Sequence, residues 1–127
     1  MTQEDKDLLL KDICARLSYK IKAQYYDKAN ECENYDIIEG IVINTPNPTV
    51  DIGQYALPVE EVKPYLFPLS SMTEKQIEEW QSLMIRDSYG ILYHTIYSFD
   101  YLYKNHIDII GLIPKDLAID ATELNIY

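Results

Sequence analysis

The spacing of the hydrophobic residues changes at Tyr19, and this change limits the fold to one that combines helix and sheet. Before Tyr19, apolar residues recur at steps of three and four, which is typical of an amphipathic helix. Thr2 is the predicted N-cap of this helix, and acidic residues follow in its first turn. The apolar face consists of Leu9, Leu10, Ile13, Cys14 and Leu17. From Tyr19 onward, apolar and polar side chains alternate, which is the period of a strand with one buried face.

Three strands are predicted after this point. The first covers residues 19–26, and a polar stretch over 27–34 indicates a hairpin loop. The second covers 35–43, is rich in β-branched residues and contains Gly40 as a predicted bulge. A turn with two prolines then precedes a third strand over 49–55. We therefore expect an antiparallel meander of about three strands.

A proline-rich connector separates this meander from the rest of the chain. Three prolines within residues 57–71 exclude a long helix there and allow one helical turn over 58–62. Thr73 and Gln76 have the spacing of a capping box, which predicts a helix that runs to about Asp87.

Residues 88–97 allow two interpretations. Tyrosines at every fourth position would form a stripe on a continuing helix: Tyr89, Tyr93, Tyr97 and Tyr101. Gly90 and the β-branched residues around it favour a break instead. We prefer a linker over 88–97, followed by a helix from Ser98, its N-cap, to Asn105.

The composition is that of a folded protein with one core. The chain has 127 residues, of which 47% are hydrophobic, and this size fits a single domain over residues 1–127. The predicted architecture is α+β: an N-terminal helix, an antiparallel meander of about three strands, the proline-rich connector, and two C-terminal helices on one sheet face.

Negative charge is concentrated in one part of the sequence. The formal net charge is −10 at pH 7, and residues 31–62 contain seven carboxylates but no lysine or arginine. We expect one polar sheet face to carry these acids. Such a surface repels phosphate backbones and anionic lipid heads, so it argues against nucleic acid and membranes as direct partners and favours a basic protein.

The sequence also predicts a cytoplasmic location. The segment over residues 1–12 lacks the features of a signal peptide, and no stretch approaches the roughly 20 apolar residues of a membrane span. Cys14 and Cys32 are expected to be reduced thiols.

No motif for catalysis, cofactor binding or metal binding stands out. His94 and His106 lie some sixty or more residues from the cysteines, so the spacing of a zinc site is missing. Neither a nucleophile elbow nor a glycine-rich phosphate loop is present. We therefore expect a protein without catalytic residues, cofactors or metal ligands, with an enzyme of unrecognised type as an alternative.

Several segments of the chain resemble one family of small acidic proteins. They cover residues 1–6, 8–12, 14–17, 62–66 with Pro68, 70–73 and 111–113 before Leu117. The family is uncharacterised and occurs in Bacteroides genomes and their prophages or mobile elements. The resemblance implies an accessory role in such a bacterium or phage, and it brings no activity or site residue.

Tyrosine is unusually abundant, with twelve residues against two phenylalanines and one tryptophan. Because tyrosine combines apolar area with a polar tip, it suits protein interfaces. We predict a protein-binding surface formed by Tyr26, Glu31, Glu33, Tyr35, Asp36 and Glu39. An alternative is that the acids mimic a phosphate array and inhibit a nucleic-acid-binding protein of host defence or replication.

Overall fold

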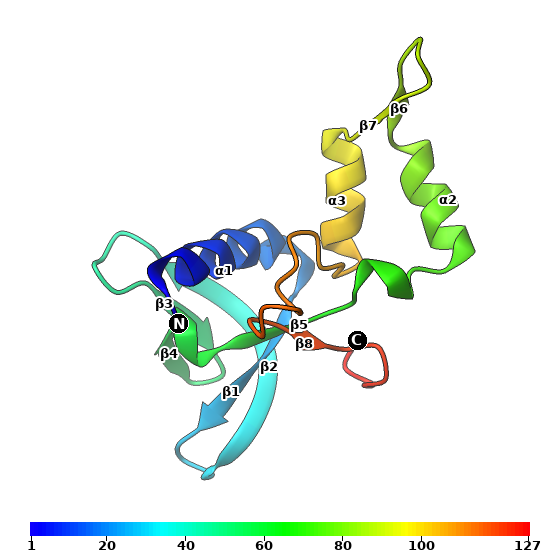
Figure 1. Cartoon of the computed structure of the whole chain (residues 1–127). Helices are drawn as coiled ribbons and strands as arrows, with labels where there is room; N and C mark the ends of the chain where they lie inside the picture. The colour runs from blue at the N-terminus through cyan, green and yellow to red at the C-terminus, as the bar shows by residue number, and fades with distance from the viewer.

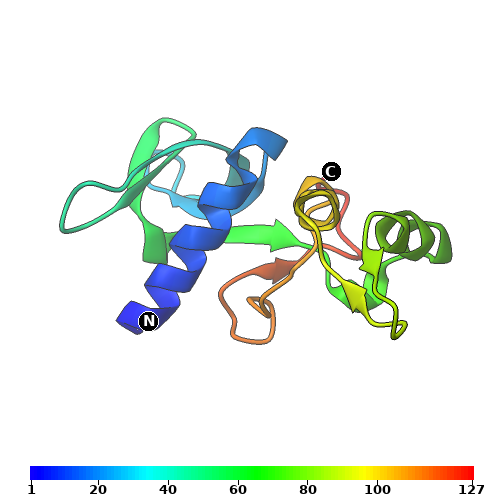
Figure 2. The ribbon, with the colours of Figure 1, turned by 90° about the horizontal axis from the view of Figure 1, so that it is seen from above.

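The computed structural model describes residues 1–127 and confirms the α+β class. Its main sheet has six strands in the order β4-β3-β2-β1-β5-β8 (Figure 1). Helix α1 covers one face of the sheet, and two further helices form an arm beside it (Figure 2). The strands of the sheet are β1 (Lys22–Asp27), β2 (Cys32–Val42), β3 (Thr49–Ile52), β4 (Tyr55–Pro58), β5 (Lys63–Leu66) and β8 (Ile119–Asp120).

Helix α1 (Gln3–Arg16) forms as the sequence predicts. The Thr2 hydroxyl accepts a hydrogen bond from the Asp5 N–H at 3.1 Å, so Thr2 is the N-cap. The chain then passes through a 3₁₀ turn (Leu17–Tyr19) and reverses at Lys20, which has a left-handed φ of 56°. The first strand therefore begins at Lys22 rather than at Tyr19.

Strands β1 and β2 form a long antiparallel hairpin. Its register pairs Lys22 with Ile37 and Asp27 with Cys32, so the connecting loop is shorter than the polar stretch suggested. The register of β2 against β3 shifts between Ile38 and Gly40, which confirms the predicted bulge.

The expectation of a three-stranded meander is wrong in two places. The chain turns at Gly53, so the predicted third strand is a hairpin of β3 and β4. The proline-rich connector contains β5, which pairs with β1 through Ala23 and Pro64 after a 3₁₀ turn (Val59–Glu61). Strand β8 then adds in parallel beside β5. The pairings of β5 with β1 and of β8 with β5 join residues far apart in the sequence, and no local pattern indicates them.

The arm consists of α2 (Glu74–Ser82), a ribbon of β6 (Ile85–Arg86) and β7 (Leu92–Tyr93), and α3 (Ile96–Lys104). The capping box of Thr73 and Gln76 is confirmed, but α2 ends before Asp87. The predicted linker contains β7 and the turn of the ribbon. Helix α3 begins earlier than expected because Thr95 is its N-cap and Ser98 completes a second capping box.

Two hydrophobic clusters stabilise the fold. The larger one lies between α1 and the sheet, where Leu9, Ile13 and Ile21 are fully buried. The smaller one belongs to the arm and contains Met72, Leu102 and Ile107. The expectation that two C-terminal helices pack on a sheet face is therefore wrong, since α1 occupies that position (Figure 1). None of the helices has both the length and the apolar character that crossing a bilayer requires.

Candidate functional site

The hairpin register brings three of the six predicted contact residues together. Tyr26 pairs with Glu33, and Gln24 pairs with Tyr35, so these side chains share one face of the sheet. Tyr25, between them in sequence, is 5% exposed and packs into the core on the opposite face. We call the side that carries Tyr26, Glu33 and Tyr35 the outer face.

The other three predicted residues lie elsewhere. Asp36 pairs with the buried Ala23, so it belongs to the core-facing side and lies beyond the edge of the core. Glu31 occupies the β1–β2 loop with a positive φ of 51°, and Glu39 is exposed at the bulge.

The acidic residues therefore do not share one sheet face, and that expectation is wrong. Consecutive strand residues point to opposite sides, which separates Glu33 from Asp36. Glu60 is farther away, beside α1, where its carboxylate lies 3.5 Å from the Lys6 ammonium. A single partner surface can therefore contact only some of these carboxylates. This arrangement does not favour mimicry of a continuous phosphate backbone.

Two tyrosines pack against each other on the outer face. The rings of Tyr35 and Tyr65 meet edge to face, with 6.0 Å between centroids and 77° between planes. Burial raises the pKa of Tyr65, and the neighbouring Tyr35 and Glu33 raise it further. Tyr65 is 5% exposed and packs against Tyr35, which is itself 47% exposed.

Asp27 fixes the loop next to this surface. Its carboxylate accepts hydrogen bonds from the Tyr55 hydroxyl at 2.6 Å and from the Asn30 side-chain amide at 2.7 Å. These bonds, the Tyr55 bond first among them, lower the pKa of Asp27 to about 2. The hydrogen bonds of this carboxylate therefore stabilise the loop that contains Glu31.

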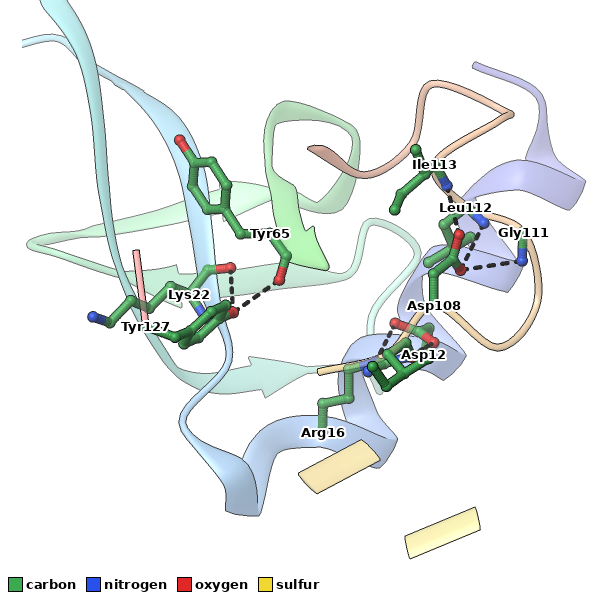
Figure 3. Close-up of polar contacts among 10 residues, drawn as sticks. Asp12, Arg16, Lys22, Tyr65, Asp108, Gly111, Leu112, Ile113 and Tyr127 are labelled. Atoms are coloured by element: carbon green, nitrogen blue, oxygen red, sulfur yellow. Dashed lines mark hydrogen bonds and ion pairs between the residues drawn. The ribbon is translucent and has the colours of Figure 1, made fainter. Parts of the chain in front are cut away.

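A buried ion pair lies within helix α1, and its arginine connects this helix to the segment that follows α3 (Figure 3). The Arg16 guanidinium contacts the Asp12 carboxylate at 2.8 Å and 3.1 Å and donates to the Ile107 carbonyl at 2.6 Å. The Tyr103 ring lies 5.0 Å from the guanidinium. Burial raises the pKa of Asp12 in spite of Arg16. Because both side chains are almost fully buried, the pair organises the fold and offers no binding surface.

The histidines do not form a reactive centre. His106 borders a cavity of about 350 Å³ whose lining residues include Lys104 and Gln76 but no carboxylate. Burial, with the nearby charges of Arg16 and Lys22, lowers the pKa of His106 to about 4, so the ring is neutral at pH 7. His94 stacks on Phe99 with 4.6 Å between centroids. No group of three or more histidine, cysteine or acidic side chains is placed to hold a metal ion.

The arm contains exposed apolar residues that the sequence reasoning missed. We call residues 83–99 the arm tip. Ile85 is 62% exposed, Tyr89 is 88% exposed and Ile96 is 77% exposed. A usable signal was present, because this stretch has one lysine or arginine and one acid among many large apolar residues.

Comparison with known proteins gives no family for this chain. No family model matches it, and no curated protein or solved structure is detectably similar to it. The resemblance to the Bacteroides family therefore stays a prediction, and the function is inferred from the geometry alone.

Proposed function

We propose that this chain is a non-enzymatic accessory protein that binds another protein through the outer face of its sheet. The observation that carries the proposal is the exposure of two tyrosines on a rigid sheet face that α1 leaves open. Tyr26 is 48% exposed and Tyr35 is 47% exposed, and both stand on strands of the long hairpin.

These tyrosines have the properties of interface anchors. A tyrosine offers a large apolar ring with a hydroxyl at its end, and it loses little conformational entropy when it is covered. The strand backbone and the contact with Tyr65 already hold Tyr35 in place. A partner would therefore cover a surface that needs little ordering, which favours affinity.

The acids beside the tyrosines favour a basic partner, and the one lysine that the register places opposite Gln24, Lys63, is already paired with Asp116 at 3.0 Å. Glu33 is exposed on the outer face opposite Tyr26, and Glu31 lies in the adjoining loop. With a net charge of −10, the chain attracts positively charged proteins at long range. These acids would act mainly on the association rate and on the choice of partner. An origin in a Bacteroides genome or a phage would place that partner in the same bacterium.

The proposal is tested by capture with two matched double variants. The bait is the full chain, and the prey is a lysate of Bacteroides cells at low salt. Tyr26→Ser with Tyr35→Ser changes the outer face, while Tyr89→Ser with Tyr97→Ser changes the arm tip by the same chemistry.

We expect a basic protein to be recovered by the wild type and by the arm-tip variant. In solution, the outer-face variant should bind this protein at least about tenfold more weakly, which corresponds to about 1.4 kcal/mol. Recovery of no protein, or equal binding by the outer-face variant, would contradict the proposal.

A further inference from the structure

We propose that the arm tip is a self-association surface, through which two copies of this chain form a symmetric dimer. This surface lies on the arm, separate from the outer face of the sheet, so the proposal does not depend on the proposed function. Figure 1 shows the ribbon of β6 and β7 at the far end of the arm, away from the sheet.

The first argument is the exposed apolar surface of the tip. Six large side chains there are each more than half exposed: Ile85, Tyr89, Ile91, Tyr93, Ile96 and Tyr97. The register pairs Ile85 with Tyr93, and Ile91 precedes Tyr93 by two positions, so these three share one face of the ribbon with Asp87, whose carboxylate accepts from the Tyr93 hydroxyl. These side chains belong to neither of the two hydrophobic clusters of the chain.

The second argument is the size of this surface. With about 200 Å² for a large side chain, six side chains that are more than half exposed offer over roughly 600 Å² per copy. Two copies together would bury over roughly 1,200 Å², which reaches the lower end of specific protein interfaces. A contact of this size requires that all six side chains are covered on both copies, so the ribbon and the start of α3 both take part in it.

The third argument is charge. The tip contains one cation and one anion, and both already have partners within it. The Arg86 guanidinium donates to the Gly90 carbonyl at 2.7 Å. The Asp87 carboxylate accepts from the N–H groups of Tyr89 and Ile91 and from the Tyr93 hydroxyl. These bonds lower the pKa of Asp87, the one from the Ile91 N–H most strongly.

This charge distribution favours a second copy over a basic protein. A basic protein would find no free carboxylate at the tip. A second copy brings an equally neutral surface, whereas the net charge of −10 resides in the rest of each chain. Because the arm tip points away from the sheet, tip-to-tip contact keeps the acidic parts of the two copies apart (Figure 1). A contact of this kind is isologous, with the same patch used on both copies.

The stability of the ribbon supports the same conclusion. Two strands of two residues each are at most marginally stable in water. Within one chain, the turn between them is held by the hydrogen bonds of the Asp87 carboxylate, by the Arg86 bond to the Gly90 carbonyl and by two backbone bonds. Packing against a second ribbon would bury the apolar face that this turn presents.

The experiment compares two isoleucine-to-aspartate variants of the full chain. Ile91→Asp places a charge at the proposed contact, where symmetry brings two such charges together. Ile43→Asp is the control, because Ile43 is 53% exposed and Ile91 is 54% exposed, and Ile43 lies next to the end of β2, far from the arm in sequence. Mass is measured by sedimentation and light scattering up to hundreds of micromolar, and folding is checked by circular dichroism.

We expect the wild type and Ile43→Asp to reach twice the chain mass of 14.8 kDa, and Ile91→Asp to stay at that mass with the fold intact. High salt should strengthen the wild-type dimer, because it screens the repulsion between the acidic bodies. A wild type that stays monomeric at every concentration would overturn the proposal and leave the tip to another partner. A dimer that survives in Ile91→Asp would overturn it as well, since its contact would lie elsewhere. Neither outcome bears on binding by the outer face.

Discussion

The ring of Tyr127 stacks on the imidazole of His106, with 3.9 Å between the ring centroids and 13° between their planes. The Tyr127 hydroxyl donates to the Tyr65 carbonyl at 2.9 Å and accepts from the Lys22 N–H at 3.0 Å (Figure 3). One side chain therefore connects the turn after α3 with β1 and β5. In this way it fixes the arm relative to the sheet.

Removing this hydroxyl should destabilise the protein. Tyr127→Phe keeps the stacked ring but leaves the Tyr65 carbonyl and the Lys22 N–H without this partner. We expect the free energy of unfolding to fall by about 1 to 2 kcal/mol in urea titrations. Tyr89→Phe is the matched control, because Tyr89 is 88% exposed, and it should change stability by less than about 0.5 kcal/mol. Equal stability of the two variants would show that the hydroxyl contacts do not hold the sheet.

His106 should make stability depend on pH in the acidic range. Its pKa in the folded protein is about 4, below the roughly 6.5 of an unfolded chain. Between these values the unfolded state takes up the proton first, so stability is full above about pH 6.5 and decreases as the pH falls toward about 4.

This dependence can be assigned to His106 by two measurements. NMR titration of the imidazole signals should show one histidine that remains neutral down to about pH 4. His106→Asn removes the titration and suits the positive φ of 59° at this position, so its stability should change less over the same pH range. A His106 signal that titrates near 6.5 would contradict the buried environment.

The ion pair of Asp12 and Arg16 should be costly to break on one side. Arg16→Met leaves the Asp12 carboxylate buried without its partner, and we expect a loss of about 3 to 5 kcal/mol. Asp12→Leu together with Arg16→Met removes both charges and should lose clearly less, as measured by a double-mutant cycle in urea. Additive losses would show that the two charges do not compensate each other in the folded state.

Local signals predicted local structure correctly. Thr2 caps α1 and Thr73 pairs with Gln76 because each of these contacts needs only residues within three positions. The start of α3 was misplaced because Thr95 and Ser98 are both good capping residues, and the sequence alone does not rank them. Strand β8 and the buried environment of Arg16 depend on contacts with distant segments, which local patterns do not encode.

The candidate surface was only partly predictable, although the sequence held more information than the prediction used. The alternation of side chains along β2 separates Glu33 and Tyr35 from Asp36 as soon as the strand is assigned. Tyr26 lies on the same face as Glu33 and Tyr35 only because of the hairpin register, and the length of the loop determines this register. The scarcity of charge among the apolar residues 83–99 was a local signal for the arm tip, but their exposure also depends on how α2 and α3 are placed beside the sheet.

The turn between β3 and β4 offers a sharp test of the packing around Tyr25. Gly53 has a φ of 59°, and a Cβ added there would lie 2.5 Å from the Tyr25 hydroxyl oxygen. Tyr25 is 5% exposed and belongs to the main core, so its ring must shift to make room for the added Cβ. Gly53→Ala should therefore cost more than the roughly 1 to 2 kcal/mol expected for left-handed backbone alone. Gly111→Ala is the control, because its φ is 79° and nothing lies within 4 Å of its Cβ position, so it should show the backbone cost only. If thermal or urea unfolding gives the same loss for both variants, the Tyr25 ring does not press against this turn.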